Sequence, residues 1–185
     1  MEALDALLNR VSVARLTDPA PNDAQREALY QAALRAPDHG QLRPWRFLSI
    51  EGKGRDTLGA LFAEALQAKG EEHPAKLEKA RAMPLRAPLL VVVIATLHEH
   101  PKVPASEQRL AAGCAAHGML IAAHAQGIGA VWRTGELAFD EHVNQGLGLA
   151  ANEEVIGYLY LGTPVNEPRQ APVLDTADFV QVWGE

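Results

Sequence analysis

The chain reads Leu89-Leu90-Val91-Val92-Val93-Ile94-Ala95 near its middle, a run of seven apolar residues of which four are β-branched. No charged or polar residue interrupts the run. A continuous apolar segment of this length is typical of a strand that is buried on both faces. We therefore predict that residues 89–95 form the strand at the centre of a sheet.

Further helices and strands are predicted on both sides of this segment. Apolar patterning and turn residues predict strands at 45–50, 130–134 and 154–161. The same signals predict helices at 2–10, 22–35, 105–126 and 139–146, with two polar helices within 54–83. We expect the polar pair to be solvated surface or a lid. Asn22 and Gln25 have the spacing of a capping box. Since no repeat or linker is present, we expect a single domain over residues 1–185.

The segment 105–126 is unusual because it is apolar around its whole circumference. Residues 110–132 contain no Asp, Glu, Lys or Arg, a length that could span a bilayer. Its Ala, Gly and His content instead favours a buried helix of a soluble protein. Such a helix must be covered on all sides. We expect its small residues to admit a second helix closely at a dimer interface, at Ala111, Ala115, Gly118 and Ala122.

The C-terminal segment, residues 163–185, is predicted to be an arm. Three prolines, Pro164, Pro168 and Pro172, disfavour a helix here. The segment nevertheless ends with Phe179 and Trp183, whose aromatic side chains favour burial. We expect the arm to pack on a partner subunit.

Composition and charge exclude several classes of protein. The formal net charge is −6, which argues against a nucleic-acid binder with a basic surface. The single cysteine, Cys114, can form neither an internal disulfide nor a zinc cluster. Residues 1–5 lack the basic and apolar start of a signal peptide. We expect a cytoplasmic protein that binds neither nucleic acid nor membrane.

Three clusters of residues could carry chemistry. Arg10, Ser12 and Arg15 follow the first predicted helix and suit a phosphate, although they could equally be solvated surface residues. Residues 35–45 place donors around a rigid turn that could hold a planar heterocycle, or hold nothing. Residues 127–135 combine a glycine turn with Trp132 and Arg133 beside a strand.

Common catalytic and metal-binding signatures are absent from the sequence. The Gly-x-Gly at 127–129 follows a helix and lacks the third glycine of a dinucleotide fingerprint. No phosphate-binding loop or nucleophile elbow occurs. The histidines match no zinc spacing, so a metal hydrolase is the least supported alternative and we expect no metal site. We also expect no nucleophilic role for Cys114.

The order and spacing of the motifs resemble the FMN-dependent nitroreductase family, in particular its small members. The likeness covers residues 4–164. Its motifs are Arg10-x-Ser12; Arg35-Ala36-Pro37-Asp38-His39 with Pro44-Trp45; Lys102-Val103-Pro104; Ala112-Gly113-Cys114-Ala115; Ala125-Gln126-Gly127-x-Gly129-x-x-Trp132-Arg133-x-Gly135; and Gly157-x-Leu159-Tyr160-Leu161-Gly162-Thr163-Pro164.

The resemblance implies an α+β fold, a three-layer sandwich in which a mixed or antiparallel sheet is flanked by helices. It also implies an intertwined homodimer with FMN at the subunit interface. By the same resemblance, Arg10, Val11, Ser12 and Arg133 hold the FMN phosphate, and Val131 and Trp132 line the flavin. Arg35 and His39 reach the flavin from the partner subunit. The implied nicotinamide contacts are Ile121, Ala122, Ala123, His124, Ala125 and Gln126.

The sequence departs from the family at three site positions and in one insertion. Many relatives carry a basic residue two positions after the serine, whereas here Arg15 stands three positions after Ser12. Val11 replaces an arginine that many relatives carry, and Arg43 replaces a glutamine before Pro44. The long helical insertion by which larger relatives cover the flavin is absent. Substrate and nicotinamide preferences therefore do not carry over.

The resemblance implies an FMN-dependent NAD(P)H oxidoreductase that passes electrons from NADH or NADPH to a nitroaromatic or quinone-like acceptor. In this interpretation the flavin carries the chemistry, and no protein side chain is needed as a catalytic acid or base. The alternative is a non-catalytic flavin-binding or interaction module.

Overall fold

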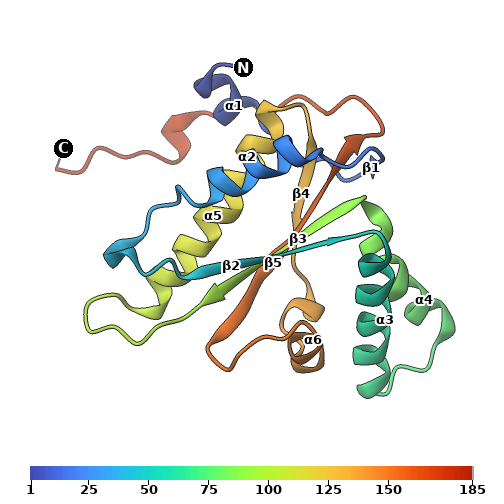
Figure 1. Cartoon of the computed structure of the whole chain (residues 1–185). Helices are drawn as coiled ribbons and strands as arrows, with labels where there is room; N and C mark the ends of the chain where they lie inside the picture. Colours follow the sequence, from blue (N-terminus) through green and yellow to red (C-terminus); the bar gives the residue numbers. More distant parts are fainter. Residues whose placement is uncertain (185) are drawn as a thin grey trace.

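A five-stranded antiparallel sheet forms the middle layer of the computed structural model, which describes residues 1–184 (Figure 1). Its order is β1-β5-β3-β2, and β4 pairs with β5. The strands are β1 (Leu16–Thr17), β2 (Trp45–Glu51), β3 (Leu89–Thr96), β4 (Gly129–Arg133) and β5 (Glu153–Pro164). All predicted strands are present, and β1 is a short addition that the sequence did not indicate.

Strand β3 lies between β2 and β5, and every residue from Leu89 to Ala95 is fully buried. Alternate side chains of a strand point to opposite faces of the sheet. Leu89, Val91 and Val93 accordingly pack in one core cluster, whereas Leu90, Val92 and Ile94 pack in another. The prediction of a central strand with two buried faces is confirmed.

Helices cover both faces of the sheet, which gives the predicted three-layer α+β sandwich (Figure 1). On one face lie α2 (Asp23–Ala33) and α5 (Ala105–Ala125); on the other lie α3 (Lys53–Ala68), α4 (Pro74–Ala82) and α6 (Glu141–Gly146). Helix α1 (Ala3–Asn9) precedes them. The short 3₁₀ segments are η1 (His39–Gln41), η2 (Pro84–Arg86), η3 (Glu136–Ala138) and η4 (Thr176–Asp178).

Local signals define the ends of the two helices on the α5 face. Helix α2 begins with the predicted capping box, in which Asn22 and Gln25 each accept a hydrogen bond from the other's backbone N–H. Helix α5 ends at Ala125 and is followed by Gly127, whose φ of +73° is readily adopted only by glycine. The N–H of Ile128 donates to the carbonyl of Ala123 (2.9 Å), which closes a Schellman turn and directs the chain into β4.

Helix α5 is not covered on all sides in the single chain, so the expectation that a partner subunit covers the rest stays a prediction. Leu110 is 69% exposed, and Cys114 and His117 are exposed beside it. The close approach at Gly118 is made within the chain, because a Cβ there would lie 3.0 Å from the carbonyl oxygen of Ala32 in α2. Within residues 1–184, no helix is long and apolar enough to cross a membrane.

The chain leaves the sheet after β5 and runs towards α1 (Figure 1). The N–H of Val165 donates to the carbonyl of Arg15 (3.1 Å), and beyond this point η4 is the only regular segment that the structure describes. Phe179 is 72% exposed and Trp183 is 98% exposed. Glu185, the last residue of the predicted arm, lies outside the described residues.

Candidate functional site

The segment after α1 lies along the start of β4. The N–H of Val13 donates to the carbonyl of Ala130 (2.9 Å), although the two residues are far apart in the sequence. This bond brings the cluster of Arg10 and Ser12 beside the glycine turn that precedes β4. Two of the three clusters singled out from the sequence therefore lie next to each other.

A cavity of about 270 Å³ lies at this junction and is lined by Arg10, Val11, His124 and the turn at 127–130, among others. Arg10 is half-buried, Val11 is buried and Ser12 is exposed. The Nε2 atom of His124 is buried and has no hydrogen-bond partner among the described residues. A buried polar atom without a partner is costly, so this nitrogen favours a ligand with a matching donor or acceptor.

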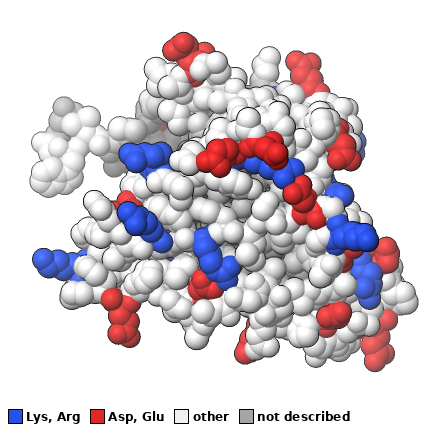
Figure 2. Space-filling view, in the orientation of Figure 1, with Lys and Arg blue, Asp and Glu red and all other residues white. Residues whose placement is uncertain are grey.

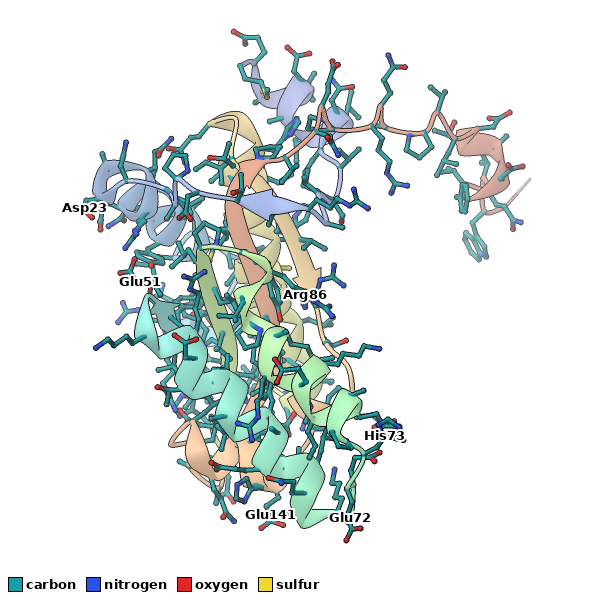
Figure 3. The ribbon with its side chains drawn as sticks, turned by 90° about the vertical axis from the view of Figure 1, so that its right-hand side faces the viewer. Asp23, Glu51, Glu72, His73, Arg86 and Glu141 are labelled. Atoms are coloured by element: carbon teal, nitrogen blue, oxygen red, sulfur yellow. The ribbon has the colours of Figure 1, made fainter. Side chains whose placement is uncertain are left out.

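A larger cavity of about 620 Å³ lies at the other end of β4, beneath α4; we call it the α4 cavity. Figure 3 views this side of the molecule, with His73 just before α4 and Arg86 beyond its end. Aromatic, apolar and basic side chains line it together with the segment after β4, namely Phe62, Leu66, Lys76, Lys79, Ala80, Met83, Arg86, Arg133, Thr134, Gly135, Glu136, Leu137, Tyr158 and Tyr160.

Arg133 connects β4 with the wall of the α4 cavity. Its guanidinium carbon lies 5.7 Å from the centroid of the Tyr160 ring, a cation–π contact. Its Nε is buried and has no hydrogen-bond partner within residues 1–184. This Nε–H is a donor that a ligand with a carbonyl or ring-nitrogen acceptor could satisfy.

Trp132, the residue before Arg133, is held in place by β5. Its indole Nε1–H donates to the carbonyl of Ile156 (3.3 Å). A Cβ at Gly157 would collide with this indole, so only glycine leaves room for it in this arrangement.

The tyrosines of the α4 cavity are uncharged at neutral pH. Burial raises the pKa of Tyr158 well above its ordinary value, and the Phe62 ring meets it edge-on with centroids 5.6 Å apart. Burial also raises the pKa of Tyr160, although the nearby guanidinium groups of Arg86 and Arg133 oppose the increase. The aromatic wall is therefore neutral, and the charge of the cavity comes from its basic and acidic side chains.

Three of the four basic side chains that line the α4 cavity are free of carboxylates. Lys76 pairs with Glu71 (2.6 Å), and this contact lowers the pKa of Glu71. Lys79, Arg86 and Arg133 form no ion pair among the described residues, and Glu136 is the only carboxylate that lines the cavity. The balance in the cavity is therefore positive, although the whole chain carries a net charge of −6. On the face shown in Figure 2, acidic and basic side chains are interspersed.

The prediction that residues 54–83 are only solvated surface or a lid missed this cavity. Lys76 and Lys79 are three residues apart and therefore share one face of α4. Tyr158 and Tyr160 are two residues apart and share one face of β5. Both spacings are visible in the sequence, but nothing in the sequence places the two faces opposite each other.

The loop after α2 forms a third part of the candidate site. Arg35 lines a cavity of about 470 Å³ together with Arg43 and Trp45. The carboxylate of Asp38 accepts hydrogen bonds from the N–H groups of Leu42 (3.1 Å) and Arg43 (2.7 Å).

Two further features of this loop concern its conformation and His39. Gln41 and Arg43 have φ values of +54° and +48°. Residues other than glycine rarely adopt this region of backbone conformation. His39 Nδ1 contacts the Glu107 carboxylate at 2.7 Å, and both side chains are about half exposed.

The residues that resemble nicotinamide contacts lie in the last turns of α5 and point in different directions. Ala123 is fully buried in the core, whereas Ile121 and His124 are partly exposed and Ala125 is exposed. The side chain of Gln126 donates to the carbonyl of Ala122 (3.0 Å).

The structure brings some predicted site residues together and separates others. Arg10, Val11 and Ser12 adjoin the start of β4, while Val131, Trp132 and Arg133 form its end. Three residue steps along the strand separate Ala130 from Arg133, roughly 10 Å. Arg10 and Arg133 therefore line different cavities, and Arg35 lines a third.

The histidines at 100 and 117 lie in different surroundings. Nδ1 of His100 accepts hydrogen bonds from the backbone of Lys102 and Val103, and His117 is exposed on α5. In residues 1–184, no group of three or more His, Cys, Asp or Glu side chains could hold a metal ion.

Comparisons of the sequence and of the structure with known proteins indicate the same family. The profile of the Nitroreductase family matches residues 7–163. The chain is 43% identical over 164 residues to "Putative NAD(P)H nitroreductase YdjA" of Escherichia coli (strain K12). The aligned residues cover 89% of each chain.

Two solved structures share the fold. A nitroreductase-like family protein from Bacillus cereus superposes with a TM-score of 0.85 at 22% identity, covering 100% of this chain and 97% of that chain. A variant of the FMN and NADPH-dependent nitroreductase NfnB from sphigopyxis sp. strain HMH superposes with a TM-score of 0.79 at 16% identity, covering 100% of both chains. Because the profile spans most of the chain and the sequence identity to YdjA is high, this chain belongs to the nitroreductase family of oxidoreductase enzymes.

Proposed function

We propose that this enzyme is an FMN-dependent NAD(P)H oxidoreductase that reduces a nitroaromatic or quinone-like acceptor. The proposal rests mainly on the Val13–Ala130 hydrogen bond, because it joins the Arg10–Ser12 cluster to the strand that ends in Trp132 and Arg133. The names of the relatives support the same activity: YdjA is described as an NAD(P)H nitroreductase, and NfnB as dependent on FMN and NADPH.

The residues along β4 fit a flavin mononucleotide. Arg10 and Ser12 would hold the phosphate through charge-assisted and neutral hydrogen bonds. Val131, Trp132 and Arg133 would lie along the ring system, and the unpartnered Nε–H of Arg133 would donate to a ring acceptor. In this proposal Arg133 would lie nearer the ring than the phosphate, because it stands at the end of β4 whereas Arg10 adjoins the start of this strand. Arg35 and His39 would reach the flavin from the partner subunit.

FMN, when bound, supplies two-electron chemistry that amino-acid side chains lack. For a nitro acceptor the balanced reaction is ArNO₂ + NAD(P)H + H⁺ → ArNO + H₂O + NAD(P)⁺. The chain's own residues would bind and orient the cofactor. The end of α5, residues 121–126, is the proposed contact for the nicotinamide.

We further propose that the enzyme is a homodimer. Apolar side chains of α1, α5 and the C-terminal arm are exposed in the single chain, among them Leu4, Leu8, Leu110, Phe179 and Trp183. Large apolar side chains exposed in this number favour an interface. A second copy would bury them and bring its Arg35 and His39 towards the flavin. The cytoplasm, which supplies NADH and NADPH, is the proposed location.

The first experiment measures flavin binding. Purified protein is expected to absorb in the flavin region, and Arg10→Ala is expected to weaken FMN binding by about tenfold or more, since hydrogen bonds to charged groups contribute about 1.5–3 kcal/mol. Quenching of FMN fluorescence gives the dissociation constant. The matched control is Arg81→Ala, on the exposed surface of α4, which should leave this constant unchanged. Protein that never binds FMN would contradict the proposal.

The second experiment separates an enzyme from a passive flavin-binding module. Anaerobic titration of the flavin-loaded protein with NADH and with NADPH should bleach the flavin absorbance. If neither nucleotide bleaches it, the non-catalytic alternative is correct.

A further inference from the structure

Glu107 is the hydrogen-bond partner of His39, the residue proposed to reach the flavin of the second copy. Nδ1 of His39 lies 2.7 Å from Oε2 of Glu107, which stands in the first turn of α5 and is 68 positions further along the chain. This distance is typical of a charge-assisted hydrogen bond. The contact between His142 and Glu64, at 3.7 Å, is too long to be one. The His39 ring therefore has a specific partner.

The backbone that carries His39 is fixed by contacts other than this one. The Asp38 carboxylate accepts hydrogen bonds from the N–H groups of Leu42 (3.1 Å) and Arg43 (2.7 Å), which close the loop on itself. The loop conformation therefore has its own support. What Glu107 adds is a contact to the imidazole ring, and this contact restricts the orientation of the side chain.

The start of α5, which carries Glu107, is fixed as well. The neighbouring Gln108 is only 1% exposed. Its Oε1 accepts from the N–H of His98 (2.8 Å), and its Nε2 donates to the carbonyls of His98 (2.8 Å) and Val103 (3.1 Å). Val103 in turn packs against the other loop at Gly40, where an added Cβ would lie 3.4 Å from its Cγ2. Both partners of the hydrogen bond therefore stand on fixed backbone.

The hydrogen bond determines which imidazole nitrogen carries a hydrogen. An ionised carboxylate only accepts hydrogen bonds, so Nδ1 of His39 carries a hydrogen in both the neutral and the protonated ring. The other nitrogen, Nε2, is left for a ligand, as an acceptor in the neutral ring and as a donor in the protonated ring. Proteins commonly select the tautomer of a functional histidine through a hydrogen bond at the nitrogen that does not meet the ligand.

We propose that Glu107 is a positioning residue for the flavin site, which fixes the tautomer and the orientation of His39 and leaves Nε2 to the flavin of the second copy. The inference rests on the proposed function, which assigns His39 to the flavin, and adds a residue that is not itself a cofactor contact. Both side chains are about half exposed, so solvent screens the pair and it contributes little to stability. Loss of Glu107 should therefore change flavin binding and leave unfolding unchanged.

The first test determines the tautomer in the full-length protein as purified. Histidine labelled with ¹⁵N gives the ring signals, and His39→Gln identifies those of His39. We expect Nδ1 to show the chemical shift of a nitrogen that carries a hydrogen, and Glu107→Ala to give a mixture of the two tautomers. The matched control is Asp56→Ala, which removes an acidic residue from the first turn of α3 and should leave the signals unchanged. A wild-type ring whose Nδ1 carries no hydrogen would overturn the proposal.

The second test is a double-mutant cycle on FMN binding, measured by quenching of FMN fluorescence. Glu107→Ala should weaken binding by about threefold to tenfold, because a positioning hydrogen bond is lost. His39→Ala should weaken binding at least as much, and Glu107→Ala should have no further effect in that background. Glu107→Gln should recover most of the affinity, since its amide oxygen can still accept from Nδ1–H. Asp56→Ala should leave the dissociation constant unchanged.

The outcomes separate the inference from the proposed function. Additive effects of Glu107→Ala and His39→Ala would overturn the inference alone, because Glu107 would then act independently of the ring. Thermal unfolding of Glu107→Ala at a much lower temperature than Asp56→Ala would also overturn it, because the pair would then stabilise the fold. A protein that binds no FMN would overturn the proposed function and the inference together.

Discussion

Glu153 is the carboxylate with the most complete set of partners among those described. It accepts from Arg46 Nε (2.6 Å) and Nη2 (2.7 Å), from the Thr96 hydroxyl (3.1 Å) and from the Ala150 N–H (2.9 Å). Its side chain is only 8% exposed. These bonds, led by the one from Arg46, lower its pKa from 4.5 to about 2. At the residue scale, the bidentate Arg46–Glu153 pair connects β2 with the start of β5 across the end of β3.

Glu153→Gln should destabilise the protein by about 1.5–3 kcal/mol at pH 7, since it weakens charged hydrogen bonds and leaves Arg46 without its carboxylate. Because the folded pKa is depressed, the stabilisation is fully present above pH 4.5. It is lost as the pH falls from 4.5 towards 2, because in this range Glu153 binds a proton in the unfolded chain but is still ionised in the folded protein. Urea unfolding at pH 7 and pH 3 measures both effects.

The matched control is Glu154→Gln. Glu154 also forms a bidentate pair, with Arg109, but both side chains are more than 40% exposed. Solvent screening reduces the contribution of such a pair to about 0–1 kcal/mol. Equal losses in the two variants would show that burial of the Arg46–Glu153 pair does not matter.

At the scale of elements, the contact between α2 and α5 fixes the layer on one face of the sheet. The approach is closest at Gly118, where a Cβ would lie 3.0 Å from the carbonyl oxygen of Ala32 and 3.7 Å from Cα of Ala33. Both neighbours are backbone atoms and cannot rotate away. The separation of the two helices therefore depends on the absence of a side chain at residue 118.

Gly118→Ala should push the helices apart and destabilise the protein by about 1–3 kcal/mol, the usual cost of overpacking. Gly113→Ala in the same helix is the control, because its Cβ would meet only Trp132 Cη2 at an ordinary 3.7 Å. That change should be neutral or stabilising by up to about 1 kcal/mol. Thermal unfolding of both variants distinguishes the packing effect from helix propensity, and similar melting temperatures would contradict it.

At the scale of the whole molecule, the apolar side chains of the C-terminal arm are exposed in the single chain, and this exposure is the basis of the proposed dimer. Val173, Phe179, Val180 and Trp183 are each more than 65% exposed in the single chain. Removing residues 170–185 should therefore abolish or greatly weaken the proposed dimer, because it removes much of the apolar area that association would bury.

Light scattering coupled to size exclusion gives the mass directly. The full chain should have about twice the mass of one 19.9 kDa subunit, and the shortened chain should shift towards one subunit. Because the proposed flavin site includes Arg35 and His39 of the second copy, the shortened chain should also bind FMN more weakly. A full chain that elutes as one subunit would exclude the proposed dimer.

The sequence by itself determined the central strand, the ends of the helices and the family. Burial on both faces is encoded in the continuous run at 89–95, and the capping box at Asn22 and the turn at Gly127 depend only on neighbouring residues. The motifs of the family are likewise local in the chain. These features could be predicted because each depends on residues that lie within one or two turns of one another.

Only the tertiary structure decided which of these local features meet. The pairing of Val13 with Ala130, the bidentate contact of Arg46 with Glu153, and the placement of α4 over Tyr158 and Tyr160 join residues that are remote in sequence. The close approach at Gly118 similarly went to α2 of the same chain and not to a second copy. Local periodicity specifies which face of an element is buried, but the register and packing of the whole sheet determine what that face contacts.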